Sequence, residues 1–505
     1  MMQPVLELIG ITKRFGALLA NDAISLTLAK GEILALLGEN GAGKTTLMNI
    51  LFGHYTADAG SVRVRGQTLP PGRPRAAIAA GVGMVHQHFT LAGNLSVLEN
   101  VMIGSEPLWR ADSQRTAARV RLAGFAERFG LPVNPDARIA DLSVGERQRV
   151  EILKALYRDA SVLILDEPTA VLARPEAEHL FATLRGMTAG GLSIIFISHK
   201  LHEVMAASDR VTVLRAGRVV AERRTRDTSA AELAELMVGR RVARPVRAQR
   251  PPGAPVLTAH NLQVRDGEAR LHGLNFTVRA GEVLGIVGVS GNGQAALGRL
   301  LCGLVHPASG TLTLHGTDMD RLGPRGLVAA GVGRIPEDRH AEGSVGDLAI
   351  WENAVLERLR DPAFSRRGLV RRAAARAFAA SLIARFDIRG ATPGTRSRLL
   401  SGGNLQKLIL GRNLAGAPRL IIANQPTRGL DEGAIAAVHG ELLAARAAGA
   451  AIVLITEDLD EAIALADRIQ AMLKGRLSAP VATEAADAQV LGLMMAGMAE
   501  GFDAA

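Results

Sequence analysis

The feature that most constrains this chain is an internal repeat. Five sequence blocks recur in the same order about 250 residues further along the 505-residue chain. The longest pair is ISLTLAKGEILALLGENGAGKTTL at 24–47 and LNFTVRAGEVLGIVGVSGNGQAAL at 274–297. The other pairs are 82–87 with 332–337, 96–100 with 349–353, 142–156 with 400–414, and 162–172 with 420–430. Such a repeat predicts two copies of one domain, residues 1–240 and 254–505, joined by a Pro- and Arg-rich linker at 241–253.

Each copy alternates short apolar runs with helical stretches. ILALLG, SVLILD and SIIFIS are short and continuous, as expected of strands buried on both faces. EHLFATLRGM and AELAELMVGR have the pattern of helices. Strands that alternate with helices predict an α/β fold with a mainly parallel core sheet in each copy. The region from about 95 to 140 is richer in helical pattern, and we expect a helical subdomain there.

Composition and charge narrow the classes of protein. The single cysteine, Cys302, excludes a disulfide framework, and every apolar run is far shorter than the roughly 20 residues of a membrane helix. The first residues lack a secretory signal pattern, so we expect a protein that is soluble or is attached to a membrane only through a partner. The net charge of +10 includes arginine clusters at 240–250 and 365–372. These favour a solvated surface but also permit attraction to anionic lipid or nucleic acid, although interleaved aromatic residues for base stacking are missing.

The first copy contains a complete phosphate-binding motif. GENGAGKT at 38–45 fits G-x-x-x-x-G-K-[ST], follows a strand-like run and opens a helical one. Backbone N–H groups at the start of a helix bind phosphate, Lys44 would neutralise the β and γ oxygens of ATP, and Thr45 would ligate Mg²⁺. The residues that we assign to the nucleotide here are Gly38, Asn40, Gly41, Gly43, Lys44, Thr45 and Thr46.

A pair of carboxylates follows a strand later in the same copy. VLILDEP at 162–168 places Asp166 and Glu167 at the strand's carboxyl end. Asp166 is suited to Mg²⁺, and Glu167 is suited to orienting or deprotonating the attacking water.

This combination resembles the ATP-binding cassette family, with LSVGE at 142–146 as its signature block. The resemblance covers nearly the whole chain, twice. It implies that Gln87 links metal and water to a partner and that His199 contacts the γ-phosphate, so that Gln87, Glu167 and His199 form the catalytic set. It also implies that Phe15 stacks on adenine, although a core position is the alternative for this residue. The implied metal ligands are Thr45, Gln87 and Asp166.

The second copy has lost this chemistry. Each functional position of the first copy aligns with a residue that cannot replace it: Gln294 for Lys44, Ala295 for Thr45, Glu337 for Gln87, Asn424 for Asp166, Gln425 for Glu167, and Glu457 for His199. A lysine charge at about 4 Å from a phosphate charge is worth roughly 4 kcal/mol. The second copy is therefore not expected to hydrolyse ATP.

The signature blocks show the opposite pattern. The second copy has an intact LSGGN with Ser401, Gly402 and Gly403, followed by Asp431, whereas the first has Val144 and Glu146. In the family that this chain resembles, two cassettes pair head to tail, and each ATP lies between one phosphate loop and the other copy's signature. Under that pairing every defect falls into one site. The chain is thus predicted to pair its own cassettes and to form one hydrolytic and one degenerate site.

Fused cassettes of this length with one degenerate half resemble the energy-coupling ATPases of bacterial importers for simple sugars and nucleosides, most closely the nucleoside branch. The implied partners are two membrane-spanning permease subunits and, indirectly, an extracytoplasmic substrate-binding protein, with the ATPase on the cytoplasmic face of the inner membrane. The alternative is a soluble tandem-cassette ATPase that acts on ribosomes or nucleic acid. The basic charge suits this alternative, but the degraded site and the short, proline-broken linker argue against it, so no nucleic acid partner is expected.

Overall fold

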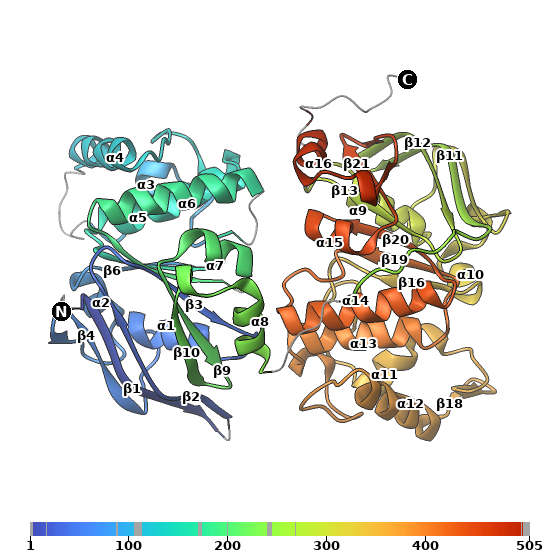
Figure 1. The fold of residues 1–505 in the computed structure, drawn as a ribbon, viewed down its shortest axis with the longest axis horizontal. Coiled ribbons are helices and arrows are strands. Elements are labelled where there is room, and N and C mark those ends of the chain that lie inside the picture. Colours follow the sequence, from blue (N-terminus) through green and yellow to red (C-terminus); the bar gives the residue numbers. More distant parts are fainter. Residues whose placement is uncertain are drawn as a thin grey trace. The chain divides into compact units, whose positions relative to one another are not determined.

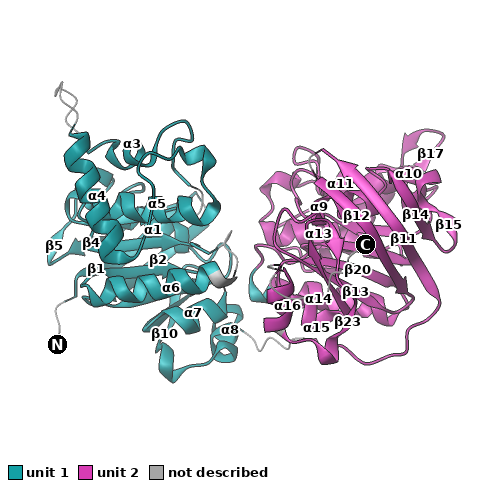
Figure 2. Cartoon of the chain, turned by 90° about the horizontal axis from the view of Figure 1, so that it is seen from above, with its two compact units in different colours: residues 1–242, 431–433 teal, residues 243–430, 434–505 magenta. Residues whose placement is uncertain are grey.

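The computed structural model describes residues 4–16, 18–86, 89–105, 114–169, 174–198, 200–239, 245–267, 269–495 and 497. The chain forms two compact units, residues 1–242 with 431–433 and residues 243–430 with 434–505 (Figure 2). Each unit contains a mainly parallel sheet, an antiparallel sheet and a group of helices (Figure 1).

The first unit is built on a six-stranded sheet in the order β10-β9-β3-β8-β7-β6, parallel except for β10, and a four-stranded antiparallel sheet in the order β2-β1-β4-β5. Its strands are β1 Leu6–Phe15, β2 Leu18–Leu28, β3 Ile33–Gly38, β4 Ala59–Val64, β5 Gln67–Thr68, β6 Val82–Val85, β7 Val162–Asp166, β8 Ser193–Ile197, β9 Arg210–Arg215 and β10 Arg218–Arg224. Its helices are α1 Lys44–Phe52, α2 Pro74–Ala79, α3 Val97–Met102, α4 Arg115–Phe129, α5 Val144–Tyr157, α6 Arg174–Ala189, α7 Leu201–Ala207 and α8 Ala230–Val238.

The second unit repeats this plan, with sheet orders β16-β19-β20-β13-β21-β22 and β12-β11-β14-β15 and a small hairpin, β17-β18. Its strands are β11 Pro255–Asp266, β12 Ala269–Arg279, β13 Val283–Val287, β14 Ser309–Leu314, β15 Thr317–Asp318, β16 Val332–Ile335, β17 Ser365–Arg366, β18 Leu369–Val370, β19 Leu420–Asn424, β20 Ala451–Thr456, β21 Arg468–Leu473, β22 Arg476–Leu477 and β23 Val481–Ala482, which pairs with β21. Its helices are α9 Gln294–Leu301, α10 Gly323–Ala329, α11 Ile350–Val355, α12 Arg372–Arg385, α13 Gly402–Leu414, α14 Glu432–Ala447, α15 Leu459–Leu465 and α16 Ala488–Met495.

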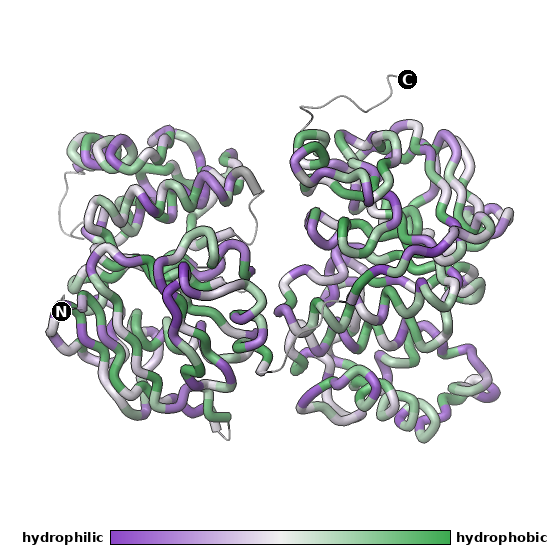
Figure 3. Tube along the Cα trace, viewed as in Figure 1, coloured by the Kyte–Doolittle hydropathy of each residue, from purple (hydrophilic) through white to green (hydrophobic). Residues whose placement is uncertain are grey.

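The parallel sheets are buried on both faces, which explains their continuous apolar strands. In β3, Ile33 and Leu37 pack into one core, while Leu34 and Leu36 pack into another on the opposite face. Figure 3 shows hydrophobic stretches running through the interior of each unit. The predicted α/β fold is confirmed, and so is the helical subdomain, since α3 and α4 lie in the region from about 95 to 140. The antiparallel sheets were not predicted.

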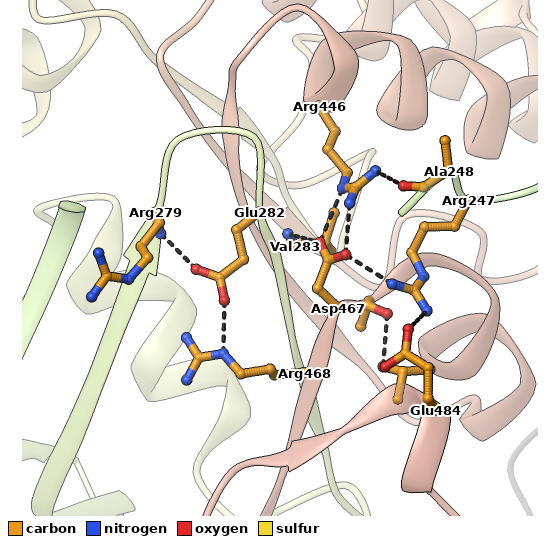
Figure 4. Close-up of polar contacts among 11 residues, drawn as sticks. Arg247, Ala248, Arg279, Glu282, Val283, Arg446, Asp467, Arg468 and Glu484 are labelled. Carbon is orange, nitrogen blue, oxygen red and sulfur yellow. Dashed lines mark hydrogen bonds and ion pairs between the residues drawn. The ribbon is translucent and has the colours of Figure 1, made fainter. Parts of the chain in front are cut away.

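The arginine-rich segment before β11 is fastened to the second unit by ion pairs (Figure 4). Arg247 donates from Nη1 to Asp467 Oδ1 at 2.8 Å and from Nη2 to Glu484 Oε1 at 2.7 Å. Arg446 donates to the same Asp467 oxygen at 2.6 Å and to the Ala248 carbonyl at 2.8 Å. This end of the segment is therefore held in place by the second unit. The assignment of residues 241–253 as a linker stays a prediction.

Candidate nucleotide site

The phosphate loop of the first unit requires glycine at its closest approaches. The loop connects β3 to α1, and Gly41 and Gly43 have φ values of 83° and 97°. Side chains other than glycine rarely adopt such values. A Cβ atom at Gly43 would also lie 2.3 Å from the carbonyl oxygen of Ala20. The backbone at the start of α1 is thus fixed as the motif requires.

Lys44 points back into this loop. Its Nζ atom donates to the carbonyl oxygens of Gly38 at 2.6 Å and Glu39 at 3.0 Å, and its side chain is 6% exposed. Burial lowers the Lys44 pKa, while the nearby charges of Glu167 and Asp166 oppose this shift. The ammonium group therefore lies against the loop, within electrostatic range of the two carboxylates.

The two carboxylates stand at the end of β7. Asp166 is buried, and its pKa is raised to about 6, first by burial and then by the charge of Glu167, with Lys44 acting in the opposite direction. Glu167 has a φ of 47°, and its backbone N–H donates to Ile197 on the neighbouring strand at 3.0 Å. A buried carboxylate beside a second negative charge is stabilised when a cation binds. The Asp166 carboxylate and the Thr45 hydroxyl are oxygen ligands of the kind that Mg²⁺ prefers.

Phe15 lies on the surface rather than in a core. Its side chain at the end of β1 is 45% exposed. It makes an edge-to-face contact with Tyr55, with ring centroids 5.6 Å apart, and the Lys13 ammonium lies 5.5 Å from its ring. The core alternative is excluded. An exposed ring is free to stack on a base, and its contact with adenine stays a prediction.

The second unit keeps the backbone of this site but not its charges. Gln294 occupies the position of Lys44 and donates to the Val289 carbonyl at 2.9 Å, after a Gly293 with φ of 112°. Asn424 ends β19 as Asp166 ends β7. Among the described residues, the side-chain oxygens of Gln294 and Asn424 are buried without a hydrogen-bond donor. This site has the fold of a phosphate loop without its cation or its carboxylates.

The signature helices share a serine cap and differ in the residue three positions after it. In the first unit Ser143 caps α5, and the Glu146 carboxylate accepts hydrogen bonds from the Ser143 hydroxyl at 2.7 Å and its N–H at 2.8 Å. These bonds lower the Glu146 pKa, so a negative charge stands at the helix start. In the second unit Ser401 caps α13, with Asn404 in place of the glutamate. A carboxylate at this position would repel a phosphate, and only the second signature is free of it.

The model of the ABC transporter family matches residues 21–170 and 271–428, which together form more than half of the chain. The chain belongs to the ABC transporter family. Each matched region contains one of the two phosphate loops and one of the two signature helices described above. Each copy is therefore an ABC cassette, and the ATPase domains of this family bind ATP.

Three relatives align with nearly the whole cassette pair. The glucose import ATP-binding protein TsgD13 of Haloferax volcanii is 45% identical, over 98% of this chain and 96% of its own length. The guanosine import ATP-binding protein NupO of Bacillus subtilis is 45% identical, over 98% of each chain. The nucleoside import ATP-binding protein NupA of Lactococcus lactis is 42% identical, also over 98% of each.

Among solved structures, the complex of the archaeal ribosomal stalk protein aP1 with the archaeal ribosome recycling factor aABCE1 contains a similar chain. The TM-score is 0.61 at 18% identity, and the match covers 92% of this chain and 87% of that one. At this identity the likeness shows the fold of the cassette pair alone.

Two predicted catalytic residues, Gln87 and His199, lie outside the described residues. The other predicted site residues of the first cassette lie at the end of β3, on the loop, in the first turn of α1, at the end of β7 or directly after it, and at the end of β1. Ser401, Gly402, Gly403 and Asp431 belong to the second copy. Their roles in a nucleotide site stay predictions.

One residue of the first cassette that the sequence analysis missed is Glu203. Its buried carboxylate accepts hydrogen bonds from the Thr169 hydroxyl at 2.6 Å and the Ser198 hydroxyl at 3.0 Å. Thr169 follows Glu167 by two residues, and Ser198 directly precedes His199, so Glu203 ties together the two segments that carry these groups. The only signal for Glu203 in the sequence was a glutamate three residues after FISHK, and this pattern resembles an ordinary surface residue of a helix.

Proposed function

We propose that this protein is the ATP-hydrolysing coupling subunit of an importer for nucleosides or simple sugars. The printed names of the relatives support this solute class, because they include guanosine, nucleoside and glucose import proteins. The observation that carries the proposal is the distribution of defects. The first cassette has the complete phosphate loop and carboxylate pair, and the second has the signature helix without a carboxylate at its start.

The hydrolytic site is a composite of the two cassettes. The phosphate loop, Asp166 and Glu167 come from the first cassette, and Ser401, Gly402, Gly403 and Asp431 come from the second. The reciprocal site combines Gln294, Asn424 and the Glu146 carboxylate, each unsuited to ATP hydrolysis. A head-to-tail pairing within one chain therefore yields one active and one degenerate site.

The residues of the first cassette divide the chemical tasks. Lys44 and the N–H groups of the loop hold the β- and γ-phosphates. Bound Mg²⁺ supplies electrostatic stabilisation of the phosphate oxygens. Thr45 and Asp166 would hold this ion with Gln87, and Glu167 orients the attacking water and accepts its proton. His199 would contact the γ-phosphate, and Phe15 would position the base.

The subunit works at a membrane through other proteins. The helices that the structure describes include none long and apolar enough to span a bilayer. The partners that we propose are two permease subunits in the membrane and, through them, an extracytoplasmic substrate-binding protein, with this subunit on the cytoplasmic face. ATP binding would close the cassette pair and hydrolysis would release it, which gives the permease two states.

The test is recovery of the tagged protein from gently solubilised native membranes, followed by identification of the proteins that copurify. Stoichiometric polytopic membrane proteins are the expected result. Uptake by the reconstituted complex is then measured with labelled nucleosides, in competition with ribose and glucose. Recovery with ribosomes or nucleic acid and without any permease would overturn the proposal in favour of the soluble tandem-cassette alternative.

A further inference from the structure

The loop that follows β16 in the second cassette is attached to the signature helix α13 at two points. The loop comprises residues 337–344. Near its far end, the Gly343 carbonyl accepts a hydrogen bond from Nη2 of the buried Arg412 in α13 at 3.1 Å. Near its start, the Arg339 guanidinium lies against the first turn of α13. A Cβ atom at Gly402 would be 3.0 Å from Arg339 Nη2, so only a glycine there admits this contact without a shift.

Arg339 also holds the loop that follows β19. Its Nη1 atom donates to the Arg428 carbonyl at 2.9 Å, and the Arg428 guanidinium in turn pairs with Glu337. A Cβ atom at Gly429 would lie 3.4 Å from Arg339 Nη2. One planar guanidinium thus contacts the signature turn with one nitrogen and the backbone of the 427–431 segment with another.

The position of Arg339 is unfavourable for a residue selected for stability alone. The start of an α-helix carries a partial positive charge, which disfavours a cation. Arg339 is half-buried, and its pKa is lowered first by burial and also by the charge of Arg428, while Asp338 partly offsets both effects. A cation held here against these costs indicates a task that its geometry performs.

Among the residues described for the first cassette, no arginine contacts the start of α5 in this way. Counted on from the repeat block at 82–87, Phe89 corresponds to Arg339, and the start of α5 is occupied by the Glu146 carboxylate instead. The far end of the first cassette's loop is still attached, because Glu151 in α5 accepts hydrogen bonds from the N–H and the hydroxyl of Thr90. Among the described residues, the arginine contact is thus found only in the cassette whose signature helix has Asn404 in place of Glu146.

We propose that Arg339 is a positioning residue for ATP hydrolysis: it fixes the first turn of α13, and with it Ser401, Gly402 and Gly403, in the orientation that meets the γ-phosphate bound by the first cassette. The inference rests on the composite site under the proposed function. Arg339 itself need not touch the nucleotide. Its fork links the loops at 337–344 and 427–431 to the signature turn, so that the three segments move together.

The test compares Arg339→Ala and Arg339→Lys in the full-length protein. Lysine keeps the charge but cannot make both contacts of the fork. The control is Arg366→Ala, which removes an exposed arginine side chain of β17 that makes no hydrogen bond or ion pair with the described residues. We expect both Arg339 variants to lower kcat at least about tenfold, as the loss of oriented contacts implies. The Kd of a fluorescent ATP analogue at the first cassette's loop should stay within about twofold, because that loop is unchanged.

Each outcome is decisive. Wild-type kcat in Arg339→Ala overturns the proposal, and full kcat in Arg339→Lys shows that charge rather than fork geometry matters, which also overturns it. A merely structural role would lower the melting temperature and the folded fraction but leave kcat per folded molecule unchanged. The ATPase activity of Lys44→Ala is measured in parallel. Retained activity in Lys44→Ala would refute the composite site itself. Loss of activity in Lys44→Ala together with full activity in Arg339→Ala would refute only the role of Arg339.

Discussion

At the scale of single residues, the two cassettes differ by charge at nearly identical backbone positions. Lys44 and Gln294 both follow a left-handed glycine, and both donate to a carbonyl at the end of the preceding strand or loop. Of these two residues, only Lys44 brings a cation to the loop, within electrostatic range of Asp166 and Glu167. The energetics of ATP binding must therefore differ between two sites whose main chains are equivalent.

Lys44→Ala is expected to reduce ATPase activity at least about 100-fold, because the lost interaction with the phosphates amounts to several kcal/mol. Gln294→Ala removes the equivalent side chain of the second cassette and should leave activity within about twofold. Phosphate release by the two purified variants measures the difference. Equal losses in both would contradict the assignment of hydrolysis to the first cassette.

Glu167→Gln should lower kcat by about 10²–10⁴-fold while ATP binding persists, because the amide cannot accept the proton of the attacking water. The matched variant, Gln425→Glu, restores the carboxylate in the second cassette. It should add no activity, since Gln294 and Asn424 remain. Single-turnover hydrolysis and nucleotide binding separate the two steps, and turnover at the wild-type rate in Glu167→Gln would remove this residue from its role.

Much of the site could be predicted from the sequence, because its motifs are local. Lys44, Asp166 and Glu167 each stand in a contiguous pattern that defines a strand end or a helix start. Glu203 and Arg339 could not be found in this way, because their roles depend on contacts between segments that are distant in the sequence. The effect of Glu146 also needed the structure, which shows its carboxylate bonded to the signature serine.

At the scale of elements, continuous apolar strands were predicted and the antiparallel sheets were missed. β1 and β2 pair with three register shifts, so the alternation of buried and exposed residues is interrupted along both strands. A period of two residues cannot be recognised across such breaks. The central strands of the parallel sheets, β3, β7, β8, β13, β19 and β20, are buried throughout and need no such alternation.

The same helix start carries a cap in one cassette and lacks it in the other. Ser96 caps α3 with φ −73° and ψ 167°, and its hydroxyl accepts the Glu99 N–H at 3.2 Å. Ala349 begins α11 with φ −68° and ψ 160°, and the Glu352 carboxylate already accepts its N–H at 2.8 Å. Half of a capping box is thus present in the second cassette.

Ala349→Ser should supply the other half and stabilise the second cassette by about 0.5–2 kcal/mol. The reverse change, Ser96→Ala, should destabilise the first cassette by a similar amount. Differential scanning calorimetry of both variants measures the two shifts in melting temperature. An unchanged or lower transition in Ala349→Ser would show that the α11 start cannot adopt the capped geometry.

At the scale of the whole molecule, the two arginine clusters differ in how their side chains are used. In the segment at 245–250, Arg247 is paired with carboxylates and Arg250 donates to the Ala447 carbonyl at 2.8 Å. The cluster at 365–372 instead forms the exposed β17-β18 hairpin and the residues next to it. Net charge alone could not separate an arginine that fastens a segment from one that faces solvent.

The most direct measurement of the central claim is the ATPase activity of Ser401→Arg and Ser143→Arg. Both serines cap equivalent signature helices, so both variants lose the same cap and gain the same bulky cation. If ATP is hydrolysed between the first cassette's loop and the second cassette's signature, Ser401→Arg should lose activity, although Ser401 lies in the copy to which we assign no catalytic residue. The same arrangement predicts activity near that of the wild type in Ser143→Arg. Loss in Ser143→Arg with an active Ser401→Arg would contradict the head-to-tail site.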